Sequence, residues 1–507
     1  MPKEAFFGPD PGTGARVIKL ENHDEAYRIW RAAGIKDRTL VHLDAHDDLW
    51  HIREESELTI ASFLSLALKN GIINRIFWVV PDLTWESSKS IRSLVRQLKK
   101  IIKSYPGRPS VFTVHPSRIS TYLLGRSLEV CTLENLPRLE EPVLLDIDTD
   151  YLMIPRAGGN EAPPIDLPWC WPQELAVRLQ AGGLRFDLAT VAYSVEGGYT
   201  PLKWKHLGDE IALRLQGSEA DPPRLLGMSA LQAAALAARQ GDLASAVESC
   251  RRAREFLPDS PAPEFHLALL CLDAGQSQPA RDHYGRARAL DPSYGTPYRH
   301  AGFNYYRTGS LVQAEQEFRR GLVLDPGDAY AYLGLGQIAA RRKRWTEAVR
   351  CLRQSLELND RLIDSHRTLA NILARQGRRP EAIRLYERSL KLALAGQKPV
   401  TDIIATDPGL LDPQHFSTHG RLARLYQMEG ETAKAVNFYR LSIAKGGGFW
   451  PRSRLAHLYL KQGQWQQSAQ EAAAALMMIP GELHGAGKKV WRRLRRVLRG
   501  HLTSGSY

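Results

Sequence analysis

The stretch Thr39-Leu-Val-His-Leu-Asp-Ala-His-Asp-Asp-Leu-Trp50 places an apolar run directly before three potential metal ligands, Asp44, His46 and Asp48. These residues are spaced two apart, and in a β-strand that spacing directs side chains to the same side. Two carboxylates and an imidazole brought together are costly to bury unless a counter-charge accompanies them. A divalent cation supplies that charge, so the stretch predicts a metal site at the end of a strand. A structural alternative, in which the acids cap the next helix or pair with arginines, stays open.

A second apolar run ends in the same manner, in Val143-Leu-Leu-Asp146-Ile-Asp148-Thr-Asp150. Asp146 and Asp148 are predicted to be metal ligands. Asp150 shares their spacing and is predicted to bond to groups around the ligands. Carboxylate-rich ligation with few imidazoles and no thiolate favours Mn²⁺ over a structural zinc site. Two strands that both end in ligands indicate a metal-dependent enzyme.

Length, charge and cysteine content narrow the class of protein. The chain has 507 residues, five cysteines and a formal net charge of +13. Residues 1–216 hold 26 Lys/Arg and 28 Asp/Glu, so the positive charge belongs to the rest of the chain. No apolar run is long enough for a transmembrane helix, the N-terminus lacks a hydrophobic signal core, and the cysteines are scattered. We therefore expect a reduced, cytoplasmic chain, and the lack of zinc-finger spacing gives no reason to expect a nucleic-acid partner.

Apolar runs alternate with amphipathic ones over residues 1–216. This rhythm predicts an α/β domain, with a mostly parallel sheet covered by helices on both faces. The predicted strands are Arg16–Leu20, Thr39–Leu43, Ile76–Val80, Ser110–Val114, Val143–Ile147 and Thr190–Val195. The predicted helices are Asp24–Ala33, Leu58–Asn70, Glu86–Ser104, Pro172–Ala181 and His206–Leu215. Functional sites in such sheets lie at the carboxyl ends of the strands, where both acidic clusters fall.

Residues 225–482, which follow a predicted linker at 217–224, repeat at an interval of about 34 residues. Small residues recur at 246, 280, 314, 348, 382, 435 and 468, each five residues after a turn residue. Pro258, Pro292, Pro326 and Pro480 each lie twelve residues after such a position. Small residues let paired helices approach closely, and proline ends the second helix. The pattern resembles the tetratricopeptide repeat and predicts an all-α solenoid of about seven repeats, with an insertion near 397–416.

Residues 483–507 are predicted to form a basic, amphipathic C-terminal helix. Val490, Trp491, Leu494 and Val497 share one face of that helix, whereas the opposite face is almost entirely arginine. The apolar face fits a cap that covers the last repeat. Contact of the basic face with an anionic surface is the alternative.

The two acidic motifs resemble those of the arginase-like ureohydrolase and deacetylase superfamily. Asp44-Ala-His46-Asp-Asp48 looks like the Asp-x-His-x-Asp motif of that family, and Asp146-Ile-Asp148 looks like its second, Asp-x-Asp motif. The resemblance implies a binuclear manganese centre held mostly by these five side chains. Deacetylase-like relatives keep one metal with fewer acidic ligands.

The resemblance also implies a histidine ligand on an earlier strand or loop. His23, in Glu21-Asn-His23, has that place, although the family usually shows Gly-Gly-Asp-His there. The order of the three motifs is most similar to the branch that contains the peptide arginases, which convert arginine side chains within peptides to ornithine. The similarity spans residues 16–205 and implies two Mn²⁺ ions that activate water for attack on a guanidinium carbon.

Three further residues are candidates for catalysis. The segment Val191-Ala-Tyr-Ser-Val-Glu196 ends an apolar run in a lone acid, and the resemblance places a guanidinium-binding glutamate near this strand. A salt bridge from Glu196 to Lys203 is the structural alternative. His51 and His115 are candidate proton shuttles, and either could instead be an ordinary surface or core histidine.

Together these features predict a hydrolase of C–N bonds, most concretely a peptide arginase, whose basic repeats bind a peptide or protein substrate. Deleting residues 225–507 is then expected to weaken peptide turnover and to spare the metal content. One alternative is a tetratricopeptide scaffold that retains a degenerate hydrolase domain. Another is a deacetylase or amidohydrolase that uses the same metal site.

Overall fold

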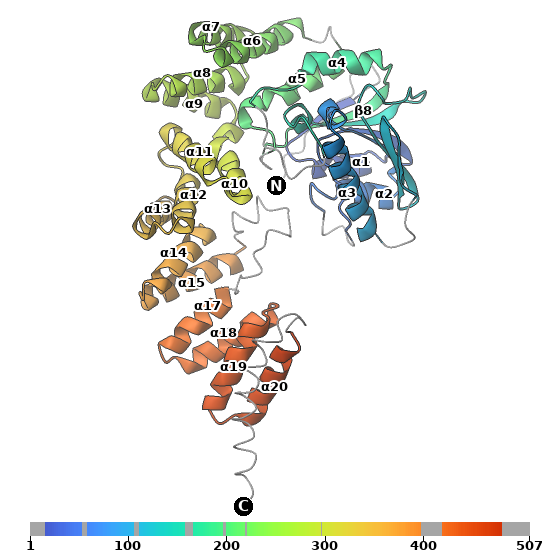
Figure 1. Cartoon of the computed structure of the whole chain (residues 1–507). Helices are drawn as coiled ribbons and strands as arrows, with labels where there is room; N and C mark the ends of the chain where they lie inside the picture. Colours follow the sequence, from blue (N-terminus) through green and yellow to red (C-terminus); the bar gives the residue numbers. More distant parts are fainter. Residues whose placement is uncertain are drawn as a thin grey trace, which may run out of the picture. The chain divides into compact units, whose positions relative to one another are not determined.

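The computed structural model describes residues 16–52, 58–105, 111–157, 166–195, 199–217, 221–295, 297–396 and 418–478. The chain divides into two compact units, Met1–Ala331 and Tyr332–Tyr507. The first unit contains a mixed sheet with its helices and the first helical repeats, and the second contains the later repeats (Figure 1). The predicted insertion near 397–416 and the predicted helix at 483–507 lie outside the described residues.

The sheet confirms the predicted α/β class. Its strands are β1 Arg16–Leu20, β2 Arg38–Leu43, β3 Ile73–Val79, β4 Thr113–Val114, β5 Arg118–Leu123, β6 Arg126–Cys131, β7 Val143–Asp148 and β8 Phe186–Ala192. They lie in the order β1-β8-β7-β2-β3-β6-β5-β4. All neighbouring pairs from β1 to β6 are parallel, whereas β5 is antiparallel to both β6 and β4. The β5–β6 hairpin was not predicted, and β8 lies closer to the N-terminus than its predicted range.

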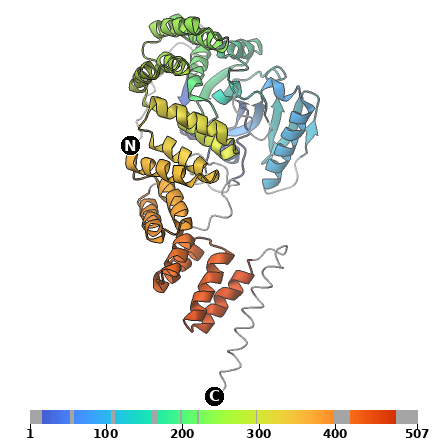
Figure 2. The same ribbon diagram turned by 60° about the vertical axis from the view of Figure 1, so that its left-hand side comes forward.

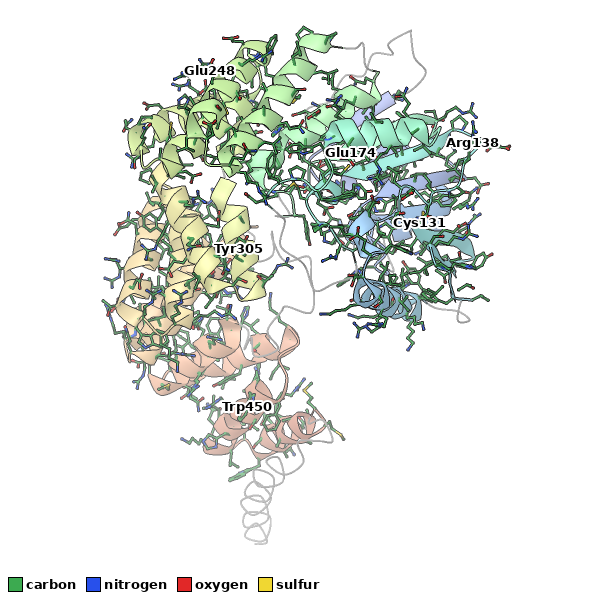
Figure 3. All side chains as sticks on the ribbon, turned by 45° about the horizontal axis from the view of Figure 1, so that its top comes forward. Cys131, Arg138, Glu174, Glu248, Tyr305 and Trp450 are labelled. Atoms are coloured by element: carbon green, nitrogen blue, oxygen red, sulfur yellow. The ribbon has the colours of Figure 1, made fainter. Side chains whose placement is uncertain are left out.

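Helices cover both faces of the sheet, as predicted. They are α1 Asp24–Ala32, α2 Phe63–Lys69, α3 Ser88–Ser104, α4 Pro172–Ala181 and α5 His206–Leu215. Trp30 of α1 and Leu98 of α3 belong to the core on one face, and Leu175 of α4 and Ile211 of α5 belong to the core on the other. Cys131, at the end of β6, is buried in the second of these cores (Figure 3).

Paired helices make up the rest of the described chain (Figure 2). They are α6 Pro222–Arg239, α7 Leu243–Phe256, α8 Pro261–Asp273, α9 Ser277–Leu290, α10 Pro297–Thr308, α11 Leu311–Leu324, α12 Ala329–Arg341, α13 Trp345–Leu358, α14 Ile363–Arg375, α15 Arg379–Leu394, α17 Thr418–Met428, α18 Thr432–Ala444, α19 Phe449–Lys461 and α20 Trp465–Leu476. The second helix of each pair carries one of the predicted small residues, and all seven are fully buried. Lys343 takes the left-handed conformation, φ 60°, that glycine has in the other turns.

The predicted prolines end second helices. Helices α7, α9 and α11 each stop two residues before Pro258, Pro292 and Pro326 respectively. This follows because proline disfavours a helical conformation in the residue before it and cannot donate a helical hydrogen bond. Pro480 lies outside the described residues. Within the part of the chain that the structure describes, no helix is long and apolar enough to cross a membrane.

The sheet and the first repeats share a hydrophobic core inside the first unit. Tyr193 and Val195, which follow β8, belong to the same cluster as Phe265 of α8 and Tyr284 of α9. The buried ammonium of Lys205 reinforces this junction. It lies 2.6 Å from a Glu21 carboxylate oxygen, 2.8 Å from the Ser293 hydroxyl and 3.5 Å from an Asp291 carboxylate oxygen.

Candidate metal centre

The carboxyl ends of four neighbouring strands bring the predicted ligands together. His23 follows β1, Asp44 follows β2, Asp148 ends β7, and Ser194 follows β8. These strands are adjacent in the sheet and parallel, so their carboxyl ends meet at one edge. The sequence argument that placed both acidic motifs at one edge is therefore consistent with the fold.

One group of ligand atoms surrounds Nδ1 of His23. This nitrogen lies 3.4 Å from Oδ2 of Asp44, 3.2 Å from Oδ2 of Asp48 and 3.2 Å from Oδ2 of Asp148. All four side chains are buried or nearly so. Ser194 donates a 2.6 Å hydrogen bond from its hydroxyl to Asp148 and so helps to hold that carboxylate.

A second group shares Asp44 with the first. Nδ1 of His46 lies 2.7 Å from Oδ2 of Asp150 and 3.5 Å from Oδ1 of Asp44. Asp150 is fully buried, and its Oδ1 has no hydrogen-bond partner. The ring of Tyr199 packs edge-on against His46, with 4.5 Å between ring centroids. Asp150 therefore has the position of a ligand, although the sequence predicted only a supporting role.

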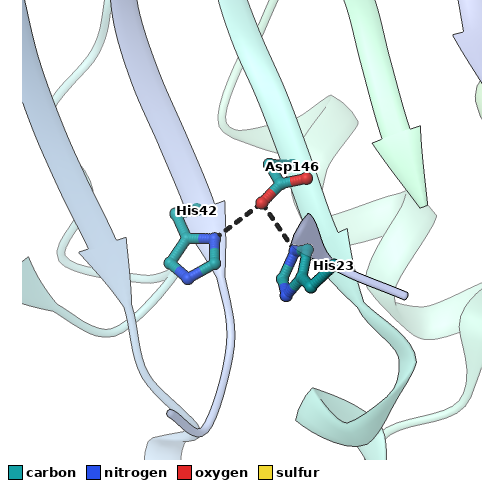
Figure 4. Close-up of side chains that lie close together, drawn as sticks. All are labelled: His23, His42 and Asp146. Atoms are coloured by element: carbon teal, nitrogen blue, oxygen red, sulfur yellow. Dashed lines mark hydrogen bonds and ion pairs between the residues drawn. The ribbon is translucent and has the colours of Figure 1, made fainter. Parts of the chain in front are cut away.

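Asp146 is fully buried inside the sheet, two residues before the end of β7. It pairs in register with His42 on β2 and Thr190 on β8. Its Oδ2 is 2.7 Å from Nε2 of His23 and 2.9 Å from Nδ1 of His42 (Figure 4), and its Oδ1 accepts a hydrogen bond from Thr190. An ionised carboxylate can only accept hydrogen bonds, so both histidines donate to it. The other nitrogen of each ring faces carboxylates of the centre. In the neutral form of the ring this nitrogen carries no proton, an arrangement common in metal-ligating histidines.

His42 belongs to the centre, and the sequence analysis did not select it. Its Nε2 lies 3.3 Å from Oδ2 of Asp44 and has no hydrogen-bond partner. His42 lies two residues before Asp44 and so continues the spacing of Asp44, His46 and Asp48. The signal for it was therefore present in the same motif. Because His42 lies within the apolar strand rather than after it, the pattern of the strand masks its role as a ligand.

A turn, rather than a strand, brings Asp44, His46 and Asp48 together. Strand β2 ends at Leu43, and the Asp44 carboxylate accepts a 2.7 Å hydrogen bond from the backbone N–H of His46. Asp48 has φ 46°, in the left-handed region. Such backbone strain in a non-glycine residue is commonly found at functional sites. The predicted convergence is present, but the predicted strand geometry for these residues is wrong.

The centre carries an excess of buried negative charge. Its members are His23, His42, Asp44, His46, Asp48, Asp146, Asp148 and Asp150. Five carboxylates therefore outnumber three imidazoles, even when every imidazole is protonated. In the described part of the chain, every ion pair of these carboxylates is with a histidine. Cations of higher charge would compensate this excess.

The pKa values in the centre reflect that crowding. Burial lowers the pKa of His42, but hydrogen bonds and charges from Asp146 and Asp44 outweigh burial and raise it to about 9. Burial and the neighbouring charge of Asp44 raise the pKa of Asp48 to about 7. Burial followed by the charges of Asp148 and Asp44 raises the pKa of Asp150 well above its ordinary value. In the metal-free protein, protons on Asp48 and Asp150 therefore neutralise part of the negative charge of the centre.

The structure does not place the two candidate proton shuttles among these residues. His51 is half-buried, and its ring packs edge-on against Tyr105 at 4.8 Å. His115 is exposed and follows β4, which forms the far edge of the sheet, beyond β3, β6 and β5. Glu196 lies outside the described residues, and its predicted role stays a prediction from the sequence.

The stability of the metal-free protein should fall as pH rises from about 4 to about 9. Asp48 has a folded-state pKa of about 7 against an ordinary 3.8, so ionisation penalises the folded state as pH rises through that window. His42, at about 9 against an ordinary 6.5, stabilises the fold fully below the ordinary pKa and loses this contribution as pH rises to 9. Mn²⁺ must displace these protons, so its stabilising effect should grow over the same range.

Thermal melts of chelator-treated protein at pH 5, 7 and 9, with and without MnCl₂, measure both trends. Asp48→Asn removes one titrating group and should flatten the lower half of the profile. A metal-free melting temperature that climbs steadily from pH 5 to pH 9 would contradict the proton balance described above.

Comparison with known proteins bears on the helical part of the chain. The tetratricopeptide-repeat family model matches residues 327–395, which contain helices α12 to α15. The repeats formed by helices α12 to α15 are therefore tetratricopeptide repeats, and the helix pairs from α6 to α11 share their interval of about 34 residues. No curated protein matches the chain.

Several solved structures are similar to this chain at low identity. PilF of Pseudomonas aeruginosa is 17% identical, with 49% of this chain and 99% of that chain covered and a TM-score of 0.25. Yeast Tom70 is 16% identical, with 62% and 66% covered and a TM-score of 0.32. The Cut9–Hcn1 assembly of the APC/C is 14% identical, with 59% and 63% covered and a TM-score of 0.32.

Proposed function

We propose that the sheet domain is a manganese-dependent hydrolase of carbon–nitrogen bonds and that the repeats bind its peptide or protein substrate. The observation that carries the proposal is a set of fully buried ligand atoms without hydrogen-bond partners, which include Nδ1 of His23, Oδ2 of Asp44 and Oδ1 of Asp150. Buried polar atoms without partners are rare in folded proteins and call for an explanation such as a bound ion.

Two ions fit the arrangement of the donors. One would be held by His23, Asp44, Asp48 and Asp148, and the other by Asp44, His46 and Asp150, with Asp44 shared. Oxygen-rich donors with a single imidazole in each group suit Mn²⁺ better than zinc.

The contacts of Asp146 favour a role different from the one implied by the arginase-like resemblance. That resemblance made Asp146 and Asp148 the second ligand pair. The oxygens of Asp146 contact Nε2 of His23, Nδ1 of His42 and the Thr190 hydroxyl, and the unpartnered nitrogens, Nδ1 of His23 and Nε2 of His42, lie on the far side of each ring. The oxygens of Asp148 also accept hydrogen bonds, from Ser194 and the backbone N–H of Asp150, but its Oδ2 lies 3.2 Å from the unpartnered Nδ1 of His23. Oδ1 of Asp150 has no hydrogen-bond partner. We therefore assign the Asp-x-Asp pair to Asp148 and Asp150, and Asp146 to the orientation of the histidines.

When bound, the ions would act as Lewis acids and activate water for attack on a carbon–nitrogen bond. The protein's own contribution is to orient the ligands and to keep the site negatively charged. Asp146 fixes the tautomer of His23, and Ser194 holds Asp148. An excess of carboxylates favours a cationic substrate group over a neutral one.

A guanidinium is the cationic group that this chemistry suits best, and the most concrete substrate is an arginine side chain in a peptide. Hydrolysis would release urea and leave ornithine. Glu196, predicted from the sequence to hold the guanidinium, would set this preference. A deacetylase acting on the same metal site remains the nearest alternative, because metal-activated water can also attack an amide carbon.

Urea release from arginine-containing peptides tests the proposal. Protein purified with MnCl₂ should release urea from such a peptide, and Asp44→Asn protein prepared in the same way should not. The same preparation should release no acetate from acetyl-lysine peptides. Acetate without urea would replace the arginase assignment with a deacetylase. Neither product from any peptide, at full manganese occupancy, would refute both activities.

The second candidate is an interaction scaffold with a degenerate hydrolase domain, which the tetratricopeptide repeats favour because such repeats serve as binding surfaces. Metal content separates it from an enzyme. An active centre should hold about two manganese ions per chain by elemental analysis. A chain that binds none after growth and dialysis in manganese would support the scaffold.

A further inference from the structure

Five arginines of the second unit lie on first helices of repeats and form no ion pair among the described residues. They are Arg367 and Arg375 on α14, Arg421 and Arg424 on α17, and Arg454 on α19. We call them the first-helix arginines. Arg375 and Arg424 are exposed, and the other three are partly buried.

Hydrogen bonds between α14 and α17 hold part of this group together. Arg367 donates from Nε to the Thr418 hydroxyl at 3.0 Å. Arg421 donates to the Asn371 side-chain oxygen, which also accepts a hydrogen bond from the Tyr386 hydroxyl. The first helices of two successive repeats therefore present their guanidiniums side by side.

Two tyrosines at equivalent positions of second helices show how closely the charges gather. Burial raises the pKa of Tyr386, whereas the charges of Arg421, Arg367 and Arg375 act to lower it. Burial likewise raises the pKa of Tyr439 to about 12 against the opposing charges of Arg454 and Arg424. All five first-helix arginines thus lie close to one of these two hydroxyls.

The first-helix arginines lack acidic partners, in contrast to other arginines of the same repeats. Arg353 and Arg388, on second helices, pair with Glu381 at 3.8 Å and Asp360 at 2.6 Å. Among the described residues, no carboxylate forms an ion pair with any of the five. Clustered guanidiniums repel one another, so an anionic ligand would be attracted by the whole group.

Arg379 and Arg452 show that unpaired charge is not general in this unit. Arg379 pairs with Glu429 at 3.2 Å, and Arg452, also on a first helix, pairs with Glu471 at 2.8 Å. Arg350 on α13 and Arg384 on α15 also form no ion pair among the described residues, but only the first-helix arginines are grouped around Tyr386 and Tyr439.

We propose that the first-helix arginines bind a carboxylate-rich segment of a peptide partner. Guanidinium groups bind carboxylates through paired hydrogen bonds, and several in a row select a chain with repeated acids. A peptide fits better than a single-stranded nucleic acid because Tyr386 and Tyr439 are buried and offer no ring face on which bases could stack. The identity of that peptide as a hydrolase substrate rests on the function proposed above, but the binding itself does not.

Fluorescence anisotropy of the full-length, metal-free chain with a labelled peptide tests the binding without any turnover. The probe is a twelve-residue peptide that contains six glutamates and one arginine, and its match has glutamine in place of each glutamate. The glutamate peptide should bind with an affinity that falls as salt is raised from about 50 to about 200 mM, because the contact is electrostatic. The glutamine peptide should show no binding.

The double variant Arg375→Gln/Arg424→Gln should weaken glutamate-peptide binding by about five- to tenfold. Arg353→Gln/Arg388→Gln removes the same charge from second helices and serves as the matched control, with less than a twofold effect expected. Circular dichroism melts confirm that both variants remain folded. Equal losses in the two variants, or equal binding of the two peptides, would overturn the proposal, as would tighter binding of poly(U) RNA than of the glutamate peptide. A chain that binds the glutamate peptide as described but releases no urea would refute only the hydrolase.

Discussion

Asp44→Asn should remove manganese from the centre and lower any manganese-dependent turnover by at least about a thousandfold. Among the described residues, Asp44 alone has two oxygens that between them take part in both groups of donors. Its Oδ2 faces His23 and His42, and its Oδ1 faces His46. An amide at this position supplies no charge and one poor ligand, so both ions would lose their shared anchor. Elemental analysis and urea release on the same preparation measure the two effects.

Matched Asp→Asn changes on β7 and just after it test which carboxylates are ligands. Asp148→Asn should resemble Asp44→Asn, and Asp150→Asn should lose about one of two ions. Asp146→Asn should keep a measurable manganese site whose affinity is about 10–100-fold weaker, because the change disturbs the orientation of His23 and His42 and not the donors themselves. Equal loss of metal in the Asp146 and Asp150 variants would show that the assignment of Asp146 to an orienting role is wrong.

The carboxyl-edge location of the centre could be predicted because it follows from hydrophobic patterning. Apolar runs that end in Asp44 and Asp148 specify parallel strands, and parallel strands place such ends together. The burial and pairing of each acid could not be predicted in this manner. The register of β7 against β2 puts Asp146 beside His42 and leaves Asp150 beyond the strand, and no spacing rule distinguishes the two.

The β5–β6 hairpin escaped prediction for a local reason. Its turn is Leu124-Gly125, and both residues have positive φ, 52° and 76°. A hairpin turn of this kind is normally indicated in the sequence by asparagine or aspartate before the glycine, and leucine at that position gives no such signal. The regular repeats posed no such difficulty, because the same small residue and the same turn recur at a fixed interval.

The junction between the sheet and the repeats was also invisible in the sequence. Composition at 217–224 predicted a linker and hence a sheet domain that keeps its metal without the repeats. The structure instead joins Tyr193 and Val195, which flank Ser194 after β8, to a core shared with α8 and α9. Such a contact depends on which apolar residues of a repeat face outward, and the repeat pattern alone does not reveal that.

A fragment that ends at residue 217 should therefore be far less stable than one that ends at residue 331. The shorter fragment exposes Tyr193, Val195 and Leu202, each of which loses about 1–3 kcal/mol of burial, and leaves Lys205 without Asp291 and Ser293. Because Lys205 also binds Glu21, two residues before His23, the loss reaches the metal centre. We expect the 1–217 fragment to melt at least about 10 °C below the 1–331 fragment, or to aggregate, and to bind manganese more weakly.

Thermal melts and manganese titrations of the two fragments and the full chain measure these differences. The 1–331 fragment should match the full chain in manganese content, because it retains the whole first unit. Lys205→Met in the full chain isolates the polar part of the junction, since methionine keeps the length of the side chain and removes its charge. Its effect on manganese affinity should be smaller than that of truncation at 217 and in the same direction. A 1–217 fragment that melts and binds manganese like the 1–331 fragment would mean that the repeats contribute nothing to the stability of the centre.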